Sequence, residues 1–522
     1  MKNNENIEQY NYNSESFWVS STESKCYDTL KDNIKTEILV VGAGLAGITI
    51  AYMLKKHGYD VVLIDKARVA SATSANTTAK ITSQHSIKYN KLKNGLGSKT
   101  AEQYGYINEQ AIRFIADTIS ENKIHCDYSI QSAYVYTQQE KNLELFENEV
   151  KTAQELNLPA SLVFKLSIPL EIKAAVKFDN QAQFHPRKYM LALLDKFTEL
   201  GGYVFENTAA NNIENDRECI TTLRNDLKII SDKVIMTSHY PFYESAGIYS
   251  ARMFGKRTYL IGGEIPRADW QNGMYLSYEE PSRTIRFQPL SAEKQILIVG
   301  GEQHKTGHSD HEFIHYQALS SFMSETFDVN HVQWRWSAQD YVTVDGLPFA
   351  GSITSGRNKI FIATGFGKWG MTGTTAAAMI IYDLITKGKC EIGSAFDPFR
   401  YNIKAAAKDF VVENSKTAAS LISGKLKMLP PISEQDIAHL QKGEGKAFSS
   451  HLNKIGVYKS EDGELYVVDL TCPHQRCELR WNSAEKTWDC PCHASRFNYK
   501  GELIEGPSHM NLKLIDFNSL GI

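Results

Sequence analysis

Hydrophobic runs and helical patterns alternate over the first third of the chain. The stretch 37–41 reads Glu-Ile-Leu-Val-Val and is followed by glycine, and a second apolar run covers 61–64. Such unbroken runs are typical of parallel strands that are buried on both faces. A helical pattern at 48–56 lies between them, so the segment has the length of a right-handed crossover. We therefore expect an α/β domain built around a parallel sheet.

Further along, the pattern changes and then returns. A helix with one apolar face is predicted at 187–200 and a buried strand at 232–237. Between about residues 240 and 340 many short, aromatic-rich strand patterns follow one another, which indicates an antiparallel sheet. A buried strand at 360–364 and a helix at 372–385 resume the first pattern. The first domain is thus predicted to be discontinuous, with the sheet inserted in it.

The last 120 or so residues have a different organisation. Phe410–Leu426 favours an amphipathic helix that Pro430-Pro431 ends, and short strand patterns begin after Ile432. The pattern predicts four segments: an N-terminal extension (1–35), a large α/β domain with an inserted antiparallel sheet (36–400), a connector (401–431) and a small all-β domain (432–522).

Composition and charge exclude several classes of protein. With 522 residues and a formal net charge of −3, the chain lacks the basic excess of a nucleic-acid binder. It contains no run of roughly 18 apolar residues, so we expect no membrane span. Met1–Glu15 is polar and Asn/Glu-rich, unlike a signal peptide, and a cytoplasmic location is the expectation.

The eight cysteines are unevenly placed. Four are scattered, whereas the other four lie close together near the C-terminus: Cys472, Cys477, Cys490 and Cys492. In a reducing compartment such a group favours a metal site over a disulfide framework.

Two histidines accompany these cysteines at fixed offsets, in Cys472-Pro-His474 and in Cys490-Pro-Cys492-His493. A [2Fe–2S] cluster needs four ligands, and each loop can give a thiolate to one iron and an imidazole to the other. A structural zinc site is the alternative, but zinc modules usually present Cys-x2-Cys pairs. The spacing favours iron.

Residues 432–522 resemble the Rieske family through these two loops. The resemblance implies four cluster ligands: Cys472, His474, Cys490 and His493. It also implies a disulfide between Cys477 and Cys492, and Gly506-Pro507 is similar to the third loop that covers the cluster in some members. Ser495 stands where the family has a hydroxyl that donates a hydrogen bond to a bridging sulfide. Phe497 replaces a tyrosine of high-potential relatives, which implies a lower potential.

A glycine motif follows the first strand and opens the first helix: Gly42-Ala-Gly44-Leu-Ala-Gly47. The first glycine permits a tight turn, the second lets a pyrophosphate approach the backbone, and the third allows close packing of helix and strand. Asp65 ends the second strand, where an acid accepts the ribose hydroxyls. These residues indicate a bound dinucleotide but do not distinguish FAD from NAD.

Residues 37–400 resemble the D-amino-acid-oxidase-like superfamily of flavoproteins. The resemblance rests on three segments: the run 68–76 after Asp65, Asp345-Gly-Leu-Pro348, and the glycine-rich stretch 363–373. The resemblance implies FAD, with contacts from these further residues: Ser74, Asn76, Gly365, Gly367, Gly370 and Thr372. It also implies that the helix after this stretch points its positive end at the flavin. Asn76 replaces the residue that bonds covalently to flavin in some relatives, so non-covalent FAD is expected. Thr372 replaces a lysine of some amine oxidases.

Two cofactors of different electron capacity suggest a function. A flavin accepts two electrons and a Rieske centre passes one at a time. We expect an FAD-dependent oxidoreductase that dehydrogenates a small amine or amino-acid-like donor and passes electrons through the cluster to an unknown acceptor. A non-catalytic electron carrier or redox sensor is the alternative. A Rieske oxygenase would need two further histidines and a carboxylate at a mononuclear iron, and no convincing set is present.

Pocket residues are predicted less sharply. Arg286 and Gln288 lie on a strand expected to face the flavin, where the arginine would bind a carboxylate, and an ordinary strand arginine is the alternative. Lys368, Trp369 and the pair Gln339-Asp340 are further candidates for the pocket. His304 and His308 are interpreted as solvated turn residues.

Overall fold

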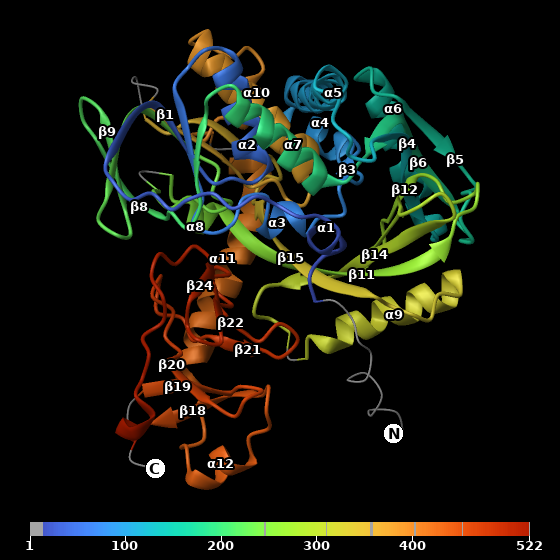
Figure 1. Ribbon diagram of the computed structural model, residues 1–522. Helices are drawn as coiled ribbons and strands as arrows, with labels where there is room; N and C mark the ends of the chain where they lie inside the picture. The colour runs from blue at the N-terminus through green and yellow to red at the C-terminus, as the bar shows by residue number, and fades with distance from the viewer. Residues whose placement is uncertain are drawn as a thin grey trace.

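The computed structural model describes residues 14–244, 247–309, 311–354, 359–400, 403–450 and 453–520. These form two large sheets covered by helices, and two small sheets at the C-terminal end (Figure 1). Within the described residues no helix is both long and apolar enough to cross a bilayer.

The first large sheet has parallel strands at its centre, as the hydrophobic runs predicted. Its order is β16 (Phe349–Ser352), β17 (Ile360–Thr364), β10 (Lys228–Met236), β1 (Ile34–Val41), β2 (Val61–Ile64) and β7 (Tyr203–Phe205), extended by β9 (Cys219–Leu223) and β8 (Ala210–Asn215). β1 pairs in parallel with both β10 and β2, and the antiparallel pairings are β16 with β17, β9 with β10 and β8 with β9.

Helices cover this sheet. α2 (Leu45–Lys56) packs against α7 (Pro186–Glu199) and α10 (Gly370–Thr386), and α10 also contacts α5 (Ser98–Glu121) (Figure 1). The other helices before residue 400 are α1 (Phe17–Ser20), α3 (Ala72–Ala75), α4 (Tyr89–Leu96), α6 (Leu143–Glu155), α8 (Tyr249–Arg252) and α9 (Phe313–Phe327), and the chain has 3-10 turns at Glu140–Asn142, Gly393–Phe396 and Phe517–Leu520.

The glycine motif makes the turn between β1 and α2. Gly42 has a φ of +110°, and a Cβ there would lie 2.7 Å from the Thr237 carbonyl oxygen. A Cβ on Gly47 would lie 1.8 Å from the Gly42 carbonyl oxygen. Only glycine satisfies both positions, so the helix begins directly above the ends of the strands.

The second large sheet has nine strands. Its order is β15 (Trp334–Thr343), β11 (Met253–Pro266), β14 (Lys294–Lys305), β13 (Arg283–Pro289), β12 (Met274–Ser277), β4 (Ser129–Thr137), β6 (Ala174–Gln183) and β3 (Lys80–Ile81), with β5 (Ala160–Val163) paired to β6. The predicted insertion at 240–340 supplies only part of it, because β3 to β6 come from residues 80–183. The two parts meet where β12 pairs in parallel with β4. No local sequence pattern predicts this long-range pairing.

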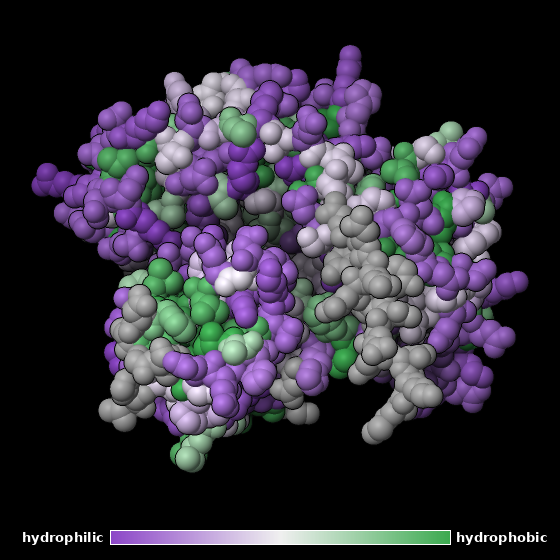
Figure 2. Space-filling view, turned by 60° about the horizontal axis from the view of Figure 1, so that its bottom comes forward, coloured by the Kyte–Doolittle hydropathy of each residue, from purple (hydrophilic) through white to green (hydrophobic). Residues whose placement is uncertain are grey.

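The C-terminal part is small and mostly β, as predicted. α11 (Ile403–Leu426) leads to α12 (Glu434–His439) and to a three-stranded sheet of β18 (Gly445–Ser450), β19 (Asn453–Lys459) and β20 (Leu465–Asp469). A four-stranded sheet follows, with β21 (Arg480–Asn482), β22 (Thr487–Asp489), β23 (Arg496–Asn498) and β24 (Leu503–Glu505). Figure 2 shows hydrophobic residues on the face of this domain, and exposed ones in this part of the chain include Leu426, Met428, Met510 and Leu514.

A buried ion network fastens this C-terminal domain to the nine-stranded sheet. Arg257 of β11, 2% exposed, pairs with Glu485, whose carboxylate also lies 2.6 Å from Arg496. Arg496 continues to Glu505 at 3.4 Å, and Glu505 reaches His239 at 3.4 Å. Burial by itself would raise the pKa of Glu505, but the hydrogen bond to His239 and the charges of Arg496 and Arg257 lower that pKa to about 2. Glu505 is therefore ionised at neutral pH.

Two glycines let the backbones of the two domains come together. A Cβ on Gly255 would lie 2.3 Å from Cβ of Ala494, and one on Gly307 would lie 2.9 Å from Cα of Pro491. His308 approaches the same loop, with Nε2 3.0 Å from the Pro491 carbonyl oxygen. His308 stays exposed after the turn, in agreement with its interpretation as a solvated turn residue, although one ring nitrogen contacts the C-terminal domain.

Candidate functional site

One cavity of about 820 Å³ runs between the two large sheets. Its walls come from distant parts of the chain: residues 41–46, 65–67, 71–78, 237–242, 366–371, 503–509, and several positions on β11 to β15.

Two helices begin at this cavity. Gly44, Leu45 and Ala46 line it at the start of α2, and Gly370 and Met371 line it at the start of α10. The N-cap residues, Gly44 of α2 and Trp369 of α10, give no side-chain hydrogen bond to the first amides, although the Leu45 amide of α2 donates to Ser74. The helix N-termini and the positive ends of their dipoles face the cavity, where they favour a phosphate at one helix and an electron-rich ring at the other.

Polar groups at the α2 end suit a nucleotide. The Asp65 carboxylate accepts hydrogen bonds from the Ala43 amide at 2.7 Å and the Ala67 amide at 2.8 Å. Burial raises the pKa of Asp65, although the amides oppose this. The Ser74 hydroxyl accepts from the Leu45 amide at 3.1 Å, and a Cβ on Gly44 would lie 2.9 Å from it. This narrow space beside the N-terminus of α2 fits a pyrophosphate.

Most of the predicted cofactor residues line the cavity, and three lie behind its wall. The lining residues are Gly42, Gly44, Asp65, Ser74, Asn76, Gly367 and Gly370, together with the pocket candidates Lys368 and Trp369. Gly47 packs against the turn of its own motif. Gly365 has a φ of +76° and packs against Thr343. The Thr372 hydroxyl donates to the Thr82 carbonyl oxygen at 2.9 Å.

The prediction that Arg286 and Gln288 face the flavin needs correction. The guanidinium of Arg286 is fully buried, donates to the carbonyl oxygens of Ala79 and Phe184 at 2.9 and 2.8 Å, and lies 5.0 Å from the ring of Trp18. Gln288 is fully buried and contacts Arg286. The face of β13 that carries Thr284, Arg286 and Gln288 does point toward the cavity. Segments around Ala79 and Phe184, however, cover the end of the strand with Arg286 and Gln288. Thr284, two residues earlier, lines the cavity instead.

Three lysines line the part of the cavity bounded by the nine-stranded sheet: Lys80, Lys256 and Lys368. Lys80 donates to the Tyr275 carbonyl oxygen at 2.6 Å, and burial lowers its pKa to about 7. Burial and the charge of Lys256 lower the pKa of Lys368 to about 8, against the opposing charge of Asp340. Sequence reasoning missed Lys80 and Lys256, because only the sheet pairing brings them to the cavity.

The predicted cluster ligands lie together in the C-terminal domain. Cys472 and Cys490 are each 1% exposed and their thiols hydrogen-bond to each other. The rings of His474 and His493 lie with centroids 4.9 Å apart. Both Nδ1 atoms are buried without a hydrogen-bond partner among the described residues. Two adjacent thiols and two unpartnered imidazole nitrogens fit the ligand set of a [2Fe–2S] cluster.

The protonation states also suit metal binding. Hydrogen bonding from Cys490 lowers the pKa of the Cys472 thiol to about 7, with help from the His474 amide. Burial lowers the pKa of His474 to about 4 and that of His493 to about 3. The imidazoles are thus neutral at pH 7, which is the form that ligates metal.

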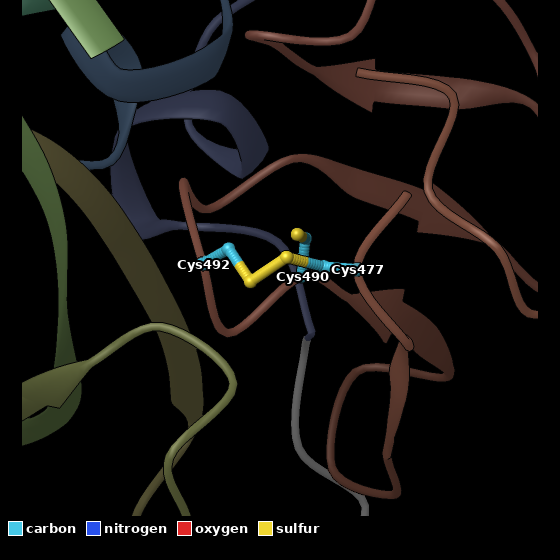
Figure 3. A group of neighbouring side chains, drawn as sticks. All are labelled: Cys477, Cys490 and Cys492. Atoms are coloured by element: carbon cyan, nitrogen blue, oxygen red, sulfur yellow. A yellow bond between two sulfur atoms is a disulfide. The ribbon is translucent and has the colours of Figure 1, made fainter. Parts of the chain in front are cut away.

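A disulfide joins the two ligand loops. Cys477 and Cys492 are bonded, with their Cα atoms 6.4 Å apart, and the Cys490 thiol lies beside them (Figure 3). The bonded sulfurs have no thiolate to give to a metal, so this pair braces the loops rather than binding iron.

Comparison with known proteins agrees with both sites. Residues 37–384 match the family described as FAD dependent oxidoreductase (DAO), and residues 432–516 match the Rieske [2Fe-2S] domain. The Bacillus subtilis protein YhfW, named as a Rieske 2Fe-2S iron-sulfur protein, is 37% identical over 97% of this chain and 98% of its own length.

More distant relatives share the larger domain. The gamma-glutamylputrescine oxidoreductase of Escherichia coli is 20% identical, over 72% of this chain and 90% of its own. Among solved structures, L-proline dehydrogenase from P. horikoshii (TM-score 0.59, 18% identity) covers 70% of this chain and 98% of its own. Glycine oxidase from Geobacillus kaustophilus (TM-score 0.58, 14% identity) covers 70% and 99%. The chain therefore belongs to the DAO family of FAD-dependent oxidoreductases, with an FAD-binding domain followed by a Rieske domain that binds a [2Fe–2S] cluster.

Proposed function

We propose that this protein is a dehydrogenase that oxidises an amine or amino-acid-like donor at FAD and sends the electrons, one at a time, to the Rieske cluster of the same chain. A separate one-electron acceptor then reoxidises the cluster. The single observation that carries the proposal is the position of β15 between the two cofactor sites.

β15 has one side toward the FAD cavity and the other toward the Rieske domain. Ala338, Asp340 and Val342 line the cavity, as does Tyr341, which also contacts the Rieske domain. Gln339 lies between Ala338 and Asp340 in sequence, and its side-chain amide donates to the Ala494 carbonyl oxygen at 2.9 Å. Ala494 directly follows the cluster ligand candidate His493 in sequence. The Tyr341 hydroxyl donates to the Gly506 carbonyl oxygen at 2.5 Å. Because one strand spans the space between the two sites, electrons have a short path, and the rate of electron transfer falls steeply with distance.

The electron count favours an onward route. Oxidation of an amine to an imine breaks one C–H bond and one N–H bond and releases two electrons and two protons, and FAD, when bound, would supply the two-electron acceptor. The cluster accepts one electron at a time, so each turnover reduces the terminal acceptor twice.

The lysines of the cavity support a donor that also carries a carboxylate. Lys80 has only one hydrogen bond among the described residues, to the Tyr275 carbonyl oxygen. Besides burial, the positive charge of Arg286 lowers the pKa of Lys80. A positively charged wall of this kind attracts an anion. The names of the relatives, a proline dehydrogenase and a gamma-glutamylputrescine oxidoreductase, point to the same class of donor.

A non-catalytic electron carrier or redox sensor is the second candidate. It would need both cofactors but no binding space for an organic donor. The charged side chains that face the cavity from the nine-stranded sheet, Lys256, Asp340 and Glu280 among them, are better explained by a donor site.

The proposal is tested by anaerobic mixing of the holoprotein with a panel of amines and amino acids. A true donor should bleach the flavin and then produce the EPR signal of the reduced cluster, with about three electron equivalents taken up per chain. If no donor in the panel bleaches the flavin, while dithionite reduces both centres, the carrier function is favoured. If a donor bleaches the flavin and the cluster stays oxidised, the electron route is wrong.

The lysine wall predicts a pH dependence for anion binding. Lys80 is protonated below its pKa of about 7 and neutral above it, so attraction for an anion is present at low pH and lost as the pH rises. Benzoate, followed by its shift of the flavin spectrum, should bind about tenfold more weakly at pH 8.5 than at pH 6.

Two variants separate charge from shape in this test. Lys80→Arg should keep tight benzoate binding at both pH values, because arginine stays charged. Lys80→Met should bind weakly at both. Equal pH dependence in the wild type and in Lys80→Met would show that another group attracts the anion.

The potential of the cluster decides whether electrons flow from flavin to iron. The Ser495 hydroxyl hydrogen-bonds to Cys472 and accepts from the Ser508 amide at 2.9 Å. It therefore lies at a ligand sulfur, and the third loop orients it. Phe497 is fully buried and offers no donor. We propose that the cluster keeps one hydrogen bond to sulfur and lacks a second, which sets its potential in the lower to middle part of the Rieske range.

Ser495→Ala should lower the cluster potential by roughly 60 mV, since a hydrogen bond to a charged sulfur contributes about 1.4 kcal/mol. The measurement is a redox titration followed by EPR. Phe497→Tyr is the matched variant and should raise the potential if its hydroxyl reaches a ligand sulfur. An unchanged potential in Ser495→Ala would remove Ser495 from the set of groups that tune the cluster.

A further inference from the structure

One wall of the FAD cavity is made by the Rieske domain. Residues Leu503–His509, which include β24 and the third cluster loop, line the same cavity as the glycine motif. In Figure 1, β24 lies directly beneath the α/β part of the molecule.

The wall faces the end of the cavity that suits the nucleotide part of FAD. Lys66, next to the ribose candidate Asp65, donates from Nζ to the Ile504 carbonyl oxygen. Tyr240 and Thr237, which follow β10, line the cavity on the same side. The start of α10 marks the flavin end of the same cavity.

Basic side chains from both domains surround this end. Lys66 and Arg224 come from the larger domain and His509 comes from the Rieske domain, and all three line the cavity. Arg224 interacts electrostatically with both Lys66 and His509, and with burial it lowers the pKa of His509. The charges of Lys66 and Arg224, with the imidazole of His509 beside the N-terminus of α2, are complementary to a diphosphate.

The wall is tied to the cluster as well as to the cavity. The Ser508 amide donates to Ser495, which in turn hydrogen-bonds to Cys472. Tyr341 donates to the Gly506 carbonyl oxygen at 2.5 Å, and Glu505 is held by Arg496 at 3.4 Å. The wall is therefore a fixed part of the docked Rieske domain.

We infer that residues Leu503–His509 of the Rieske domain are part of the FAD-binding site and enclose the adenosine diphosphate half of the cofactor. FAD binding and docking of the Rieske domain are then coupled. By linkage, docking raises the affinity for FAD by the same factor by which FAD favours docking. This inference goes beyond the proposed function, since it holds whether or not electrons cross between the centres.

The test is a variant that moves the Rieske domain without touching the cavity. Gly255 lies outside the cavity lining, and a Cβ there would lie 2.3 Å from Cβ of Ala494. Gly255→Ala should therefore displace the Rieske loop. FAD is removed from the holoprotein and its rebinding is followed by flavin fluorescence. The dissociation constant of Gly255→Ala should rise about tenfold.

A second substitution supplies the matched control. Ala494 has a φ of +68°, a conformation that glycine adopts without strain. Gly255→Ala combined with Ala494→Gly removes the clash and should restore the wild-type dissociation constant, and Ala494→Gly alone should leave it unchanged. Iron and sulfide content, with the EPR spectrum, establishes that the cluster is intact in each variant.

An independent variant and a direct readout keep the test decisive. Glu485→Gln weakens the ion network from a position outside the cavity lining and should also weaken FAD binding. Hydrogen exchange of the wild type should show that FAD protects peptides covering 503–509. The inference is overturned if these peptides exchange equally with and without FAD and both variants bind FAD as the wild type does.

Discussion

Close contact between the Rieske loops and the edge of the nine-stranded sheet is the constraint on which the rest of this structure depends. Side chains at positions 255 and 307 would collide with Ala494 and Pro491. Their absence lets the ligand loop lie against β11 and the turn after β14. The same contact brings the third cluster loop onto the FAD cavity and Gln339 and Tyr341 onto the cluster domain.

Buried charges set the register of this contact. Arg257, Glu485, Arg496 and Glu505 lie within the interface, and each is paired there. Taking such groups out of water costs several kcal/mol per ion, so the network adds less to stability than its number of ion pairs suggests. An unpaired member would be far more costly, and a shifted interface would leave members unpaired. The network thereby selects one docked arrangement.

The features that were predicted from sequence are local ones. β2 and β17 have the predicted bounds, because a buried parallel strand is a short apolar run. The glycine motif and the Cys-His loops were found because their chemistry depends on spacing along the chain. The covering of Arg286 by Trp18 and Ala79, the parallel pairing of β12 with β4, and the Rieske wall of the FAD cavity join segments far apart in sequence. No spacing of residues along the chain predicts these long-range contacts, and they are seen only in the folded structure.

The central claim is that flavin and cluster exchange electrons inside one chain. The most direct measurement is the rate at which the cluster becomes reduced after flash photoreduction of FAD in oxygen-free solution, repeated over a wide range of protein concentration. Transfer across β15 predicts a first-order rate constant that is the same at every concentration. A rate that rises in proportion to protein concentration would mean that electrons pass between molecules, and would contradict the account.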